Sequence, residues 1–188
     1  MNPRVRKCAR LPIGLALLLT FSLGGGAARG QEIDEYQLKA ACLYNIAKFV
    51  EWPAEAFKGP ADPIVVCILG GGPLGSALEP AVKGKPIGDR SVVTRGIPAM
   101  RQAGGCHIVF FSASERKRER AMLSETRPVG ILTVGESASF ASEGGVINFK
   151  IEGERVRIQI NVDAAERAKV RISAKLLSLA QIVKETPR

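Results

Sequence analysis

Apolar residues recur with a helical period over residues 36–52. At about 100° per residue, one half of the helix carries the apolar set Leu38, Cys42, Ile46, Phe49, Val50 and Trp52. Pro53 disfavours helical backbone at the residue before it, so we expect the helix to end at Trp52. The charges of Lys39 and Glu51 argue against a membrane span. The pattern therefore predicts an amphipathic helix with a wide apolar face.

Short apolar runs rich in β-branched residues follow this helix and predict buried strands. The strands are expected at residues 63–69, 90–97, 106–112 and 129–134, with a helix at 114–126. Near the C-terminus, residues 146–151 and 155–162 flank a glycine turn at Gly153 and predict a β-hairpin. A short helix capped by Asp163, with Glu166 in the capping-box position, and a helix over residues 174–184 close the chain.

Strands that alternate with helices and then give way to a hairpin predict the α/β class. We expect one domain with a mixed, mostly parallel sheet of about six strands, flanked by helices, with the hairpin and a helix at its C-terminal end. No internal repeat or linker divides residues 31–188, so this segment is expected to form the whole domain.

The first thirty residues resemble a secretory signal peptide. Arg4, Arg6, Lys7 and Arg10 precede an apolar segment, and small residues follow it. The alternative is a transmembrane anchor, but the apolar segment is shorter than the roughly 20 residues that span a bilayer. We therefore expect residues 1–30 to form a signal peptide that is removed on export, with the cut after Ala28 or Gly30.

Export changes the meaning of the net charge. The chain has 27 Lys and Arg residues against 18 Asp and Glu residues, and a formal charge of +9. Five of the basic residues and none of the acidic ones lie in residues 1–30, which leaves 22 basic and 18 acidic residues, or +4. A charge of this size on an exported protein does not indicate nucleic-acid binding.

A glycine-rich motif after the first strand is the most tempting chemical signal. Residues 70–75 read GGGPLG, which fits G-x-G-x-x-G, and Asp89 follows at a distance typical of dinucleotide-binding folds. Pro73, however, removes a backbone N–H from the loop that would hold a pyrophosphate, and Pro80 shortens the helix that follows. We interpret the motif as a strand-to-helix turn, with a weak anion site as the alternative.

No other residue pattern indicates catalysis. His107 is the only histidine and begins an apolar strand, where a packed role is more common than a catalytic one. The chain has no C-x-x-C, no nucleophile-elbow motif around its serines and no carboxylate pair in a distinctive spacing. We therefore expect no enzymatic activity, no cofactor and no metal.

Three cysteines follow the signal segment, at positions 42, 67 and 106. Cys67 and Cys106 lie on strands whose spacing, if they are neighbours, suits a disulfide bond, while Cys42 is expected to be a buried thiol on the first helix. The alternative is three buried thiols without a bridge.

Six blocks of the sequence, taken in order, resemble the YfiR-type periplasmic regulators. They are KAACLYNIAKFVEWP, IVVCILG with PLGSALE, CHIVFFSASE, ILTVGE, FASEGGVINF, and RVRIQINVDAAERAKVRISAKLLSLAQIV, between residues 36 and 183. The resemblance implies an α/β domain and a disulfide bond between Cys67 and Cys106. Some relatives carry a second cysteine pair around residues 141–148, which this chain lacks.

The resemblance also implies a function. It implies a periplasmic repressor that binds the periplasmic part of an inner-membrane diguanylate cyclase, thereby lowering cyclic di-GMP and biofilm formation, and that an outer-membrane lipoprotein can sequester. A protein-binding regulator should expose apolar residues that its own core does not use, and we expect this partner or homodimer surface either on the first helix around Tyr44 and Trp52 or on the final hairpin. The alternative is a periplasmic module that binds a small molecule in the crevice at the strand ends near residues 70–75 and Gly135.

Overall fold

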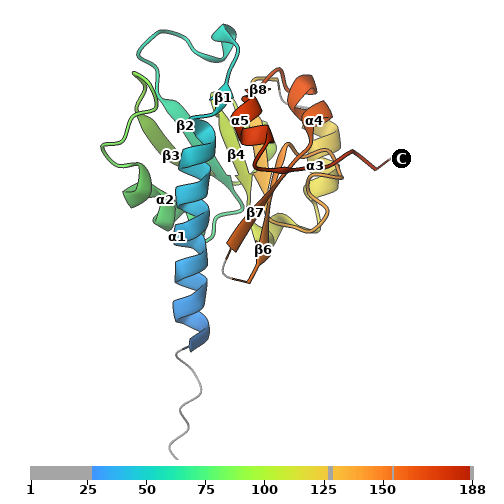
Figure 1. Cartoon of the computed structure of the whole chain (residues 1–188). Helices are drawn as coiled ribbons and strands as arrows, with labels where there is room; N and C mark the ends of the chain where they lie inside the picture. The colour runs from blue at the N-terminus through green and yellow to red at the C-terminus, as the bar shows by residue number, and fades with distance from the viewer. Residues whose placement is uncertain (1–26, 127–128, 154, 187–188) are drawn as a thin grey trace, which may run out of the picture.

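The computed structural model describes residues 27–126, 129–153 and 155–186. They form a single α/β domain around a mixed, mostly parallel sheet, which confirms the expected class (Figure 1). Residues 1–26 of the expected signal peptide lie outside the described residues. Residues 27–30 belong to the first helix, α1 (Ala27–Ala47).

The main sheet has seven strands in the order β3-β2-β4-β5-β6-β7-β9. In chain order they are β2 (Ile64–Leu69), β3 (Val92–Ile97), β4 (Ile108–Phe111), β5 (Leu132–Gly135), β6 (Ile147–Glu152), β7 (Arg155–Ile160) and β9 (Gln181–Ile182). The strands from β3 to β6 run parallel, and the hairpin β6–β7 supplies the antiparallel pair. A separate antiparallel pair joins β1 (Val50–Glu51) to β8 (Arg171–Ile172).

Helices cover both faces of the sheet, which explains why its central strands are apolar throughout. One face packs against α1, α2 (Pro73–Val82), α4 (Val162–Arg167) and α5 (Ala174–Leu177). The opposite face packs against α3 (Glu119–Thr126), the short helix η2 (Met100–Gln102) and Phe140. In Figure 1, α1 and the β6–β7 hairpin extend toward the same side of the molecule.

The expected first helix is too long at its C-terminal end. It stops at Ala47, and Val50 and Glu51 form β1 instead, paired with Ile172 and Arg171. Backbone pairing with a distant segment therefore overrides the local helical period before Pro53 is reached.

The last expected helix is also too long. Only residues 174–177 are helical, and Gln181 and Ile182 form β9 beside β7. The helix expected at 114–126 is divided into the 3₁₀ turn η3 (Ala113–Glu115) and α3. Asn161, and not Asp163, caps α4, because its side chain accepts from the N–H of Ala164.

The helix after β2 is longer than expected. α2 continues through Pro80 to Val82, so Pro80 does not end it.

Candidate functional site

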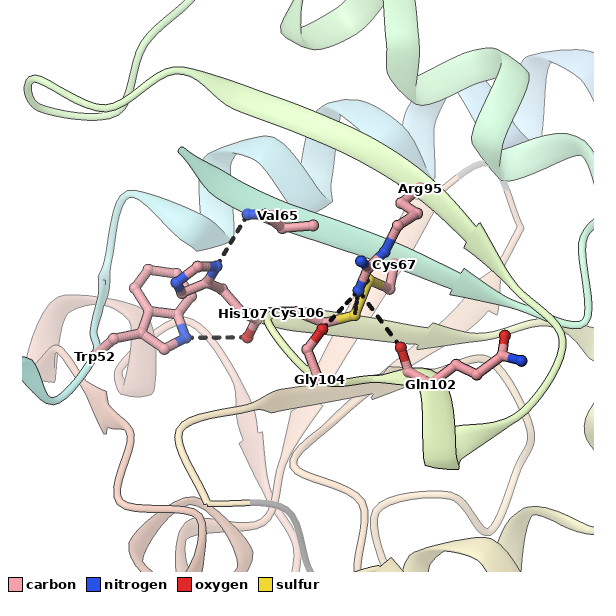
Figure 2. The surroundings of a disulfide bond; sticks show 8 residues. All are labelled: Trp52, Val65, Cys67, Arg95, Gln102, Gly104, Cys106 and His107. Atoms are coloured by element: carbon pink, nitrogen blue, oxygen red, sulfur yellow. Dashed lines mark hydrogen bonds between the residues drawn. A yellow bond between two sulfur atoms is a disulfide. The ribbon is translucent and has the colours of Figure 1, made fainter. Parts of the chain in front are cut away.

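A disulfide bond joins Cys67 of β2 to Cys106, just before β4, with their Cα atoms 5.9 Å apart (Figure 2). The expected pairing is therefore confirmed. Cys67 lies opposite Val109 in the strand register, so the bridge depends on the turn before β4 and not on two level strand residues. Arg95 of β3 covers the bridge, with its Nη2 3.0 Å from Cys106 Sγ and 2.9 Å from the carbonyl oxygen of Gly104.

His107, the residue after this bridge, is buried and fully hydrogen-bonded. Its Nδ1 accepts from the N–H of Val65 at 3.0 Å, which leaves Nε2 to donate to the carbonyl oxygen of Ala56 at 3.1 Å. Phe57 stacks on the imidazole with ring centroids 4.4 Å apart. Burial lowers the pKa of His107 below its ordinary value. The ring is thus held neutral and connects β2 to the segment of Ala56 and Phe57, as is typical of a structural residue.

Trp52 and Tyr44, the expected partner residues, are both half-buried. The indole N–H of Trp52 donates to the carbonyl oxygen of His107 at 3.0 Å, so this side chain braces the N-terminal end of β4 (Figure 2). The hydroxyl of Tyr44 donates to the carbonyl oxygen of Pro86 at 3.3 Å, and the ammonium of Lys48 lies over its ring. Their role as partner contacts stays a prediction.

Cys42 is a free thiol on α1, but it is half-buried and not fully buried as expected. Desolvation raises its pKa. The reason for its partial exposure is that the buried apolar stripe of α1 consists of Ala40, Leu43, Ile46 and Ala47. Cys42 therefore lies at its margin, and Leu38 lies outside it, 40% exposed.

The glycine loop before α2 makes room for protein side chains. A Cβ on Gly70, whose φ is +82°, would lie 2.5 Å from the hydroxyl oxygen of Ser114. Ser114 donates to the carbonyl oxygen of Gly70, and Ser112 donates to that of Gly71. The loop therefore serves as the packing surface for η3, in line with the turn that Pro73 led us to expect.

Gly135 at the end of β5 has a similar role. A Cβ on Gly135 would lie 2.3 Å from the ring of Phe140, and one on Gly145 would lie 2.1 Å from it. The two glycines hold Phe140 between them on the sheet, where its ring packs at 5.1 Å from that of Phe111. This part of the expected crevice is therefore occupied by a core aromatic residue.

A polar cavity lies just beyond Gly135, at the carboxyl end of β5. We use this name for the space of about 480 Å³ lined by Glu35, Tyr36, Lys39, Ala113, Arg116, Glu136, Ser137, Ala138, Ser139, Asn148, Phe149, Lys150 and Ile151. Its central feature is an ion pair between Lys39 of α1 and Glu136, whose side chains are only 4% and 5% exposed.

Both members of this ion pair have further partners. Glu35 approaches the ammonium of Lys39 at 2.5 Å, one helical turn away. Glu136 accepts from the hydroxyl of Tyr36 at 3.2 Å and from the N–H of Ala113 at 3.1 Å. The network ties α1 to the ends of β4 and β5, and it compensates for the removal of two charges from water.

Asn148 of β6 is completely buried in the lining of the same cavity. Its Nδ2 donates to Gln159 of β7 at 2.9 Å, and Gln159 donates in turn to Gln181 of β9 at 3.0 Å. Its Oδ1 has no hydrogen-bond partner among the described residues. Buried polar groups in folded proteins are almost always paired, so this atom is an exception among the described residues.

Glu119 of α3 lies behind Ser137 and is 1% exposed. Ser137 donates to Glu119 Oε2, whereas Oε1 has no partner among the described residues. Desolvation raises the pKa of this carboxyl above its ordinary value.

The described residues form three segments, 27–126, 129–153 and 155–186. Within them no cluster of three or more His, Cys, Asp or Glu side chains is arranged to hold a metal ion. No helix there is both long enough and apolar enough to cross a membrane.

The sequence reasoning missed the residues of the polar cavity. Lys39 did leave a signal, because the helical period places it within the apolar stripe and not opposite to it. Glu136 and Asn148 left none, since a carboxylate after a strand and an amide within one are both common on exposed surfaces. Only their packing against α1 and β7 makes them unusual.

Two comparisons with known proteins bear on this architecture. A search of proteins with curated functions finds no match to the chain. The family model described as YfiR/HmsC-like matches residues 36–181, from Tyr36 within α1 to the first residue of β9. The matched segment covers most of the chain, with six of the seven strands of the main sheet in full and the first residue of β9. The chain therefore belongs to the YfiR/HmsC-like family.

Proposed function

We propose that this protein is an exported, non-catalytic regulator that binds the periplasmic region of an inner-membrane signalling protein, a diguanylate cyclase, and holds it inactive. Family membership over residues 36–181 is the observation that carries this proposal. The disulfide bond is consistent with an oxidising compartment such as the periplasm. Sequestration of the regulator by an outer-membrane lipoprotein, which releases the cyclase, and formation of a homodimer belong to the same proposal.

The edge of the main sheet that β9 forms supports a protein-binding role. β9 is the last strand in the sheet order, and Leu179 and Ile182 are 73% and 50% exposed there. Ile151, on the neighbouring hairpin, is 38% exposed. An unpaired strand edge flanked by exposed apolar side chains is a surface that a partner can cover. We call Leu179, Ile182 and the outer edge of β9 the β9 surface.

The opposite edge of the sheet offers a matched control. β3 is the terminal strand on that side, and its Val93 is 40% exposed. Leu179→Asp, in the turn before β9, and Val93→Asp, on β3, each place a carboxylate at an exposed position, where a substitution has little effect on folding. If the β9 surface binds the partner, only Leu179→Asp should prevent capture of the cyclase.

The decisive experiment combines binding and signalling. Tagged protein purified from the periplasm is used to capture partners from solubilised inner membranes, and cyclic di-GMP is measured in a strain that lacks the gene. We expect capture of a diguanylate cyclase, and a rise in cyclic di-GMP that the wild-type gene reverses. Unchanged cyclic di-GMP with no membrane partner recovered would contradict the proposal. Tyr44→Ala, tested beside Leu179→Asp, decides whether α1 contributes to the same contact.

A second function, the binding of a small molecule at the carboxyl ends of the strands, is favoured by one specific observation. The polar cavity, with a volume of about 480 Å³, lies at those strand ends and is lined by charged side chains from α1 and from the residues after β5. The two functions are compatible, because the cavity and the β9 surface lie on different parts of the sheet.

A further inference from the structure

Residues 115–120, where η3 leads into α3, read ERKRER, so that acidic and basic residues are mixed in the sequence. The folded chain separates them. Glu115 and Glu119 are turned inward and are only 6% and 1% exposed. The basic side chains of the segment are all exposed, and we call them the α3 basic patch: Arg116, Lys117, Arg118 and Arg120.

The two buried carboxylates leave most of this positive charge unpaired. Glu115 forms an ion pair with Arg118 at 2.6 Å, whereas Glu119 accepts from the hydroxyl of Ser137 in the loop after β5. Desolvation disfavours the ionised form of Glu119 and raises its pKa. The remaining cations form no ion pair with any residue that the structure describes; they are Arg116, Lys117 and Arg120.

The three unpaired cations lie on one side of a helical segment. Arg116 has right-handed helical backbone angles, and the N–H of Arg118 donates to the carbonyl oxygen of Glu115 at 2.7 Å, so the chain winds continuously from η3 into α3. With 3.6 residues per turn, positions 116, 117 and 120 span about 100° of the circumference, on the side away from the two glutamates. A flat anionic surface can contact all three at once, whereas one small anion cannot.

This arrangement lowers the stability of α3. Cations at the first turn of a helix oppose its macrodipole, and like charges one turn apart, such as Arg116 and Arg120, repel each other. Residues that break such local rules are expected where they have a use other than folding. The α3 basic patch is therefore a candidate interaction surface.

The composition of the patch favours a membrane surface over a protein surface. The centre of a protein interface is rich in aromatic and apolar side chains and poor in charged ones. Between residues 116 and 121, the exposed side chains are those of the patch and that of Ala121. Clusters of about four to eight Lys and Arg residues bind bilayers of anionic phospholipid, and each cation contributes about fivefold in affinity.

We propose that the α3 basic patch docks the protein onto a bilayer that contains anionic phospholipid. Arg116, Lys117 and Arg120 contact the headgroup phosphates, while Glu115 holds Arg118 at the edge of the contact. The contact is electrostatic and reversible, because the patch consists of basic side chains alone. For an exported protein, this surface is the periplasmic face of the inner membrane, where the signalling partner proposed above resides. The inference goes beyond the repressor function and does not depend on the identity of that partner.

Flotation of the protein, purified from the periplasm, with lipid vesicles tests this contact. The anionic vesicles contain phosphatidylethanolamine with about 30 mol% phosphatidylglycerol, and in the neutral vesicles phosphatidylcholine replaces the phosphatidylglycerol. At about 50 mM NaCl we expect the anionic vesicles to be bound about 100-fold more tightly than the neutral ones. Most of this binding should be lost at about 500 mM NaCl, because salt screens exposed charges.

Two triple variants with the same change in net charge separate the patch from the charge of the whole protein. Combined Arg116→Gln, Lys117→Gln and Arg120→Gln should weaken binding to the anionic vesicles by about 100-fold. The matched control neutralises three exposed lysines in other segments and should weaken binding by less than about fivefold. Its substitutions are Lys58→Gln, Lys83→Gln and Lys184→Gln. Urea unfolding followed by Trp52 fluorescence verifies that both variants are folded.

Several results would overturn the proposal. Equal binding to the two kinds of vesicle, or unchanged binding of the patch variant, would show that the patch does not recognise anionic lipid. Equal losses in the two triple variants would assign the binding to net charge. Absence of binding to the anionic vesicles would also refute it; if the patch variant then fails to capture the membrane partner, the patch serves an acidic protein surface instead. The vesicles contain no protein, so these results leave the repressor function to its own test.

Discussion

The two ends of the parallel strands differ in how completely their polar groups are paired. At the amino end of β4, His107 uses both ring nitrogens, and a disulfide bond lies beside it. At the carboxyl end of β5, Asn148 leaves Oδ1 unpaired beside a cavity. A fully paired group stabilises the fold, whereas an unpaired one lowers stability and is retained where it has another use. The comparison identifies the amino end as structural and the carboxyl end as the candidate binding end.

The largest effect is expected from His107→Leu. The substitution leaves the N–H of Val65 and the carbonyl oxygen of Ala56 without partners and removes the stack on Phe57. We expect the free energy of unfolding to fall by about 3–5 kcal/mol. Urea unfolding followed by the fluorescence of Trp52, the only tryptophan, measures this change. A loss below about 1 kcal/mol would mean that the contacts of His107 do not stabilise the amino end of β4.

The double substitution of Cys67 and Cys106 by serine should have a slightly smaller effect. The bond closes a loop with a sequence separation of 39, for which chain entropy predicts a stabilisation of about 3–4 kcal/mol. Cys42→Ser is the matched control and should change the free energy of unfolding by less than about 1 kcal/mol. Similar losses in both variants, measured by the same unfolding experiment, would contradict the assignment of the disulfide as the stabilising bond.

The lowered pKa of His107 predicts a pH dependence of stability. Because the folded state binds a proton less readily than the unfolded state, this contribution is fully present above the ordinary histidine pKa of about 6.5. It is lost as the pH falls from there toward the folded-state pKa. His107 is the only histidine, so the decline between about pH 7 and pH 5.5 should disappear in His107→Leu. An unchanged decline in this variant would assign the effect to another group.

Glu119 should produce the opposite pH dependence. Its pKa is raised by burial, so the folded state holds a proton that the unfolded state releases. The contribution is greatest below the ordinary glutamate pKa of about 4.3 and is lost as the pH rises through the folded-state value. Glu119→Gln keeps a hydrogen-bonding group beside Ser137 without a charge, and we expect it to be more stable than the wild type at pH 7. Lower stability of the variant at that pH would contradict this.

Asn148→Leu should have the smallest effect on stability, within about 1 kcal/mol of zero. The substitution removes an unpaired buried carbonyl, which is favourable, and also removes the bond to Gln159, which is half-buried and has Gln181 as a second partner. Urea unfolding of this variant beside His107→Leu gives the sharpest test of the comparison. A loss as large as that of His107→Leu would show that both ends are equally structural.

The sequence alone determined the fold class and most of the sheet. β2, β4 and β5 are uninterrupted apolar runs because both faces of a central parallel strand are covered. The hairpin was also predictable, because β7 alternates between apolar and polar residues and follows the glycine turn at Gly153. These features depend on local patterns, which are present in the sequence before the chain folds.

The tertiary structure decided the ends of the helices and the nature of the polar cavity. Residues 50–51 and 181–182 leave their helical patterns because distant strands, β8 and β7, pair with their backbone. Lys39 and Asn148 are ordinary polar residues in the sequence, and they become buried only where α1 and the β6–β7 hairpin meet the ends of β4 and β5. A local pattern records which face of an element is apolar. Whether one polar group on that element finds a partner depends on segments far away in the sequence, and so only the folded chain determines it.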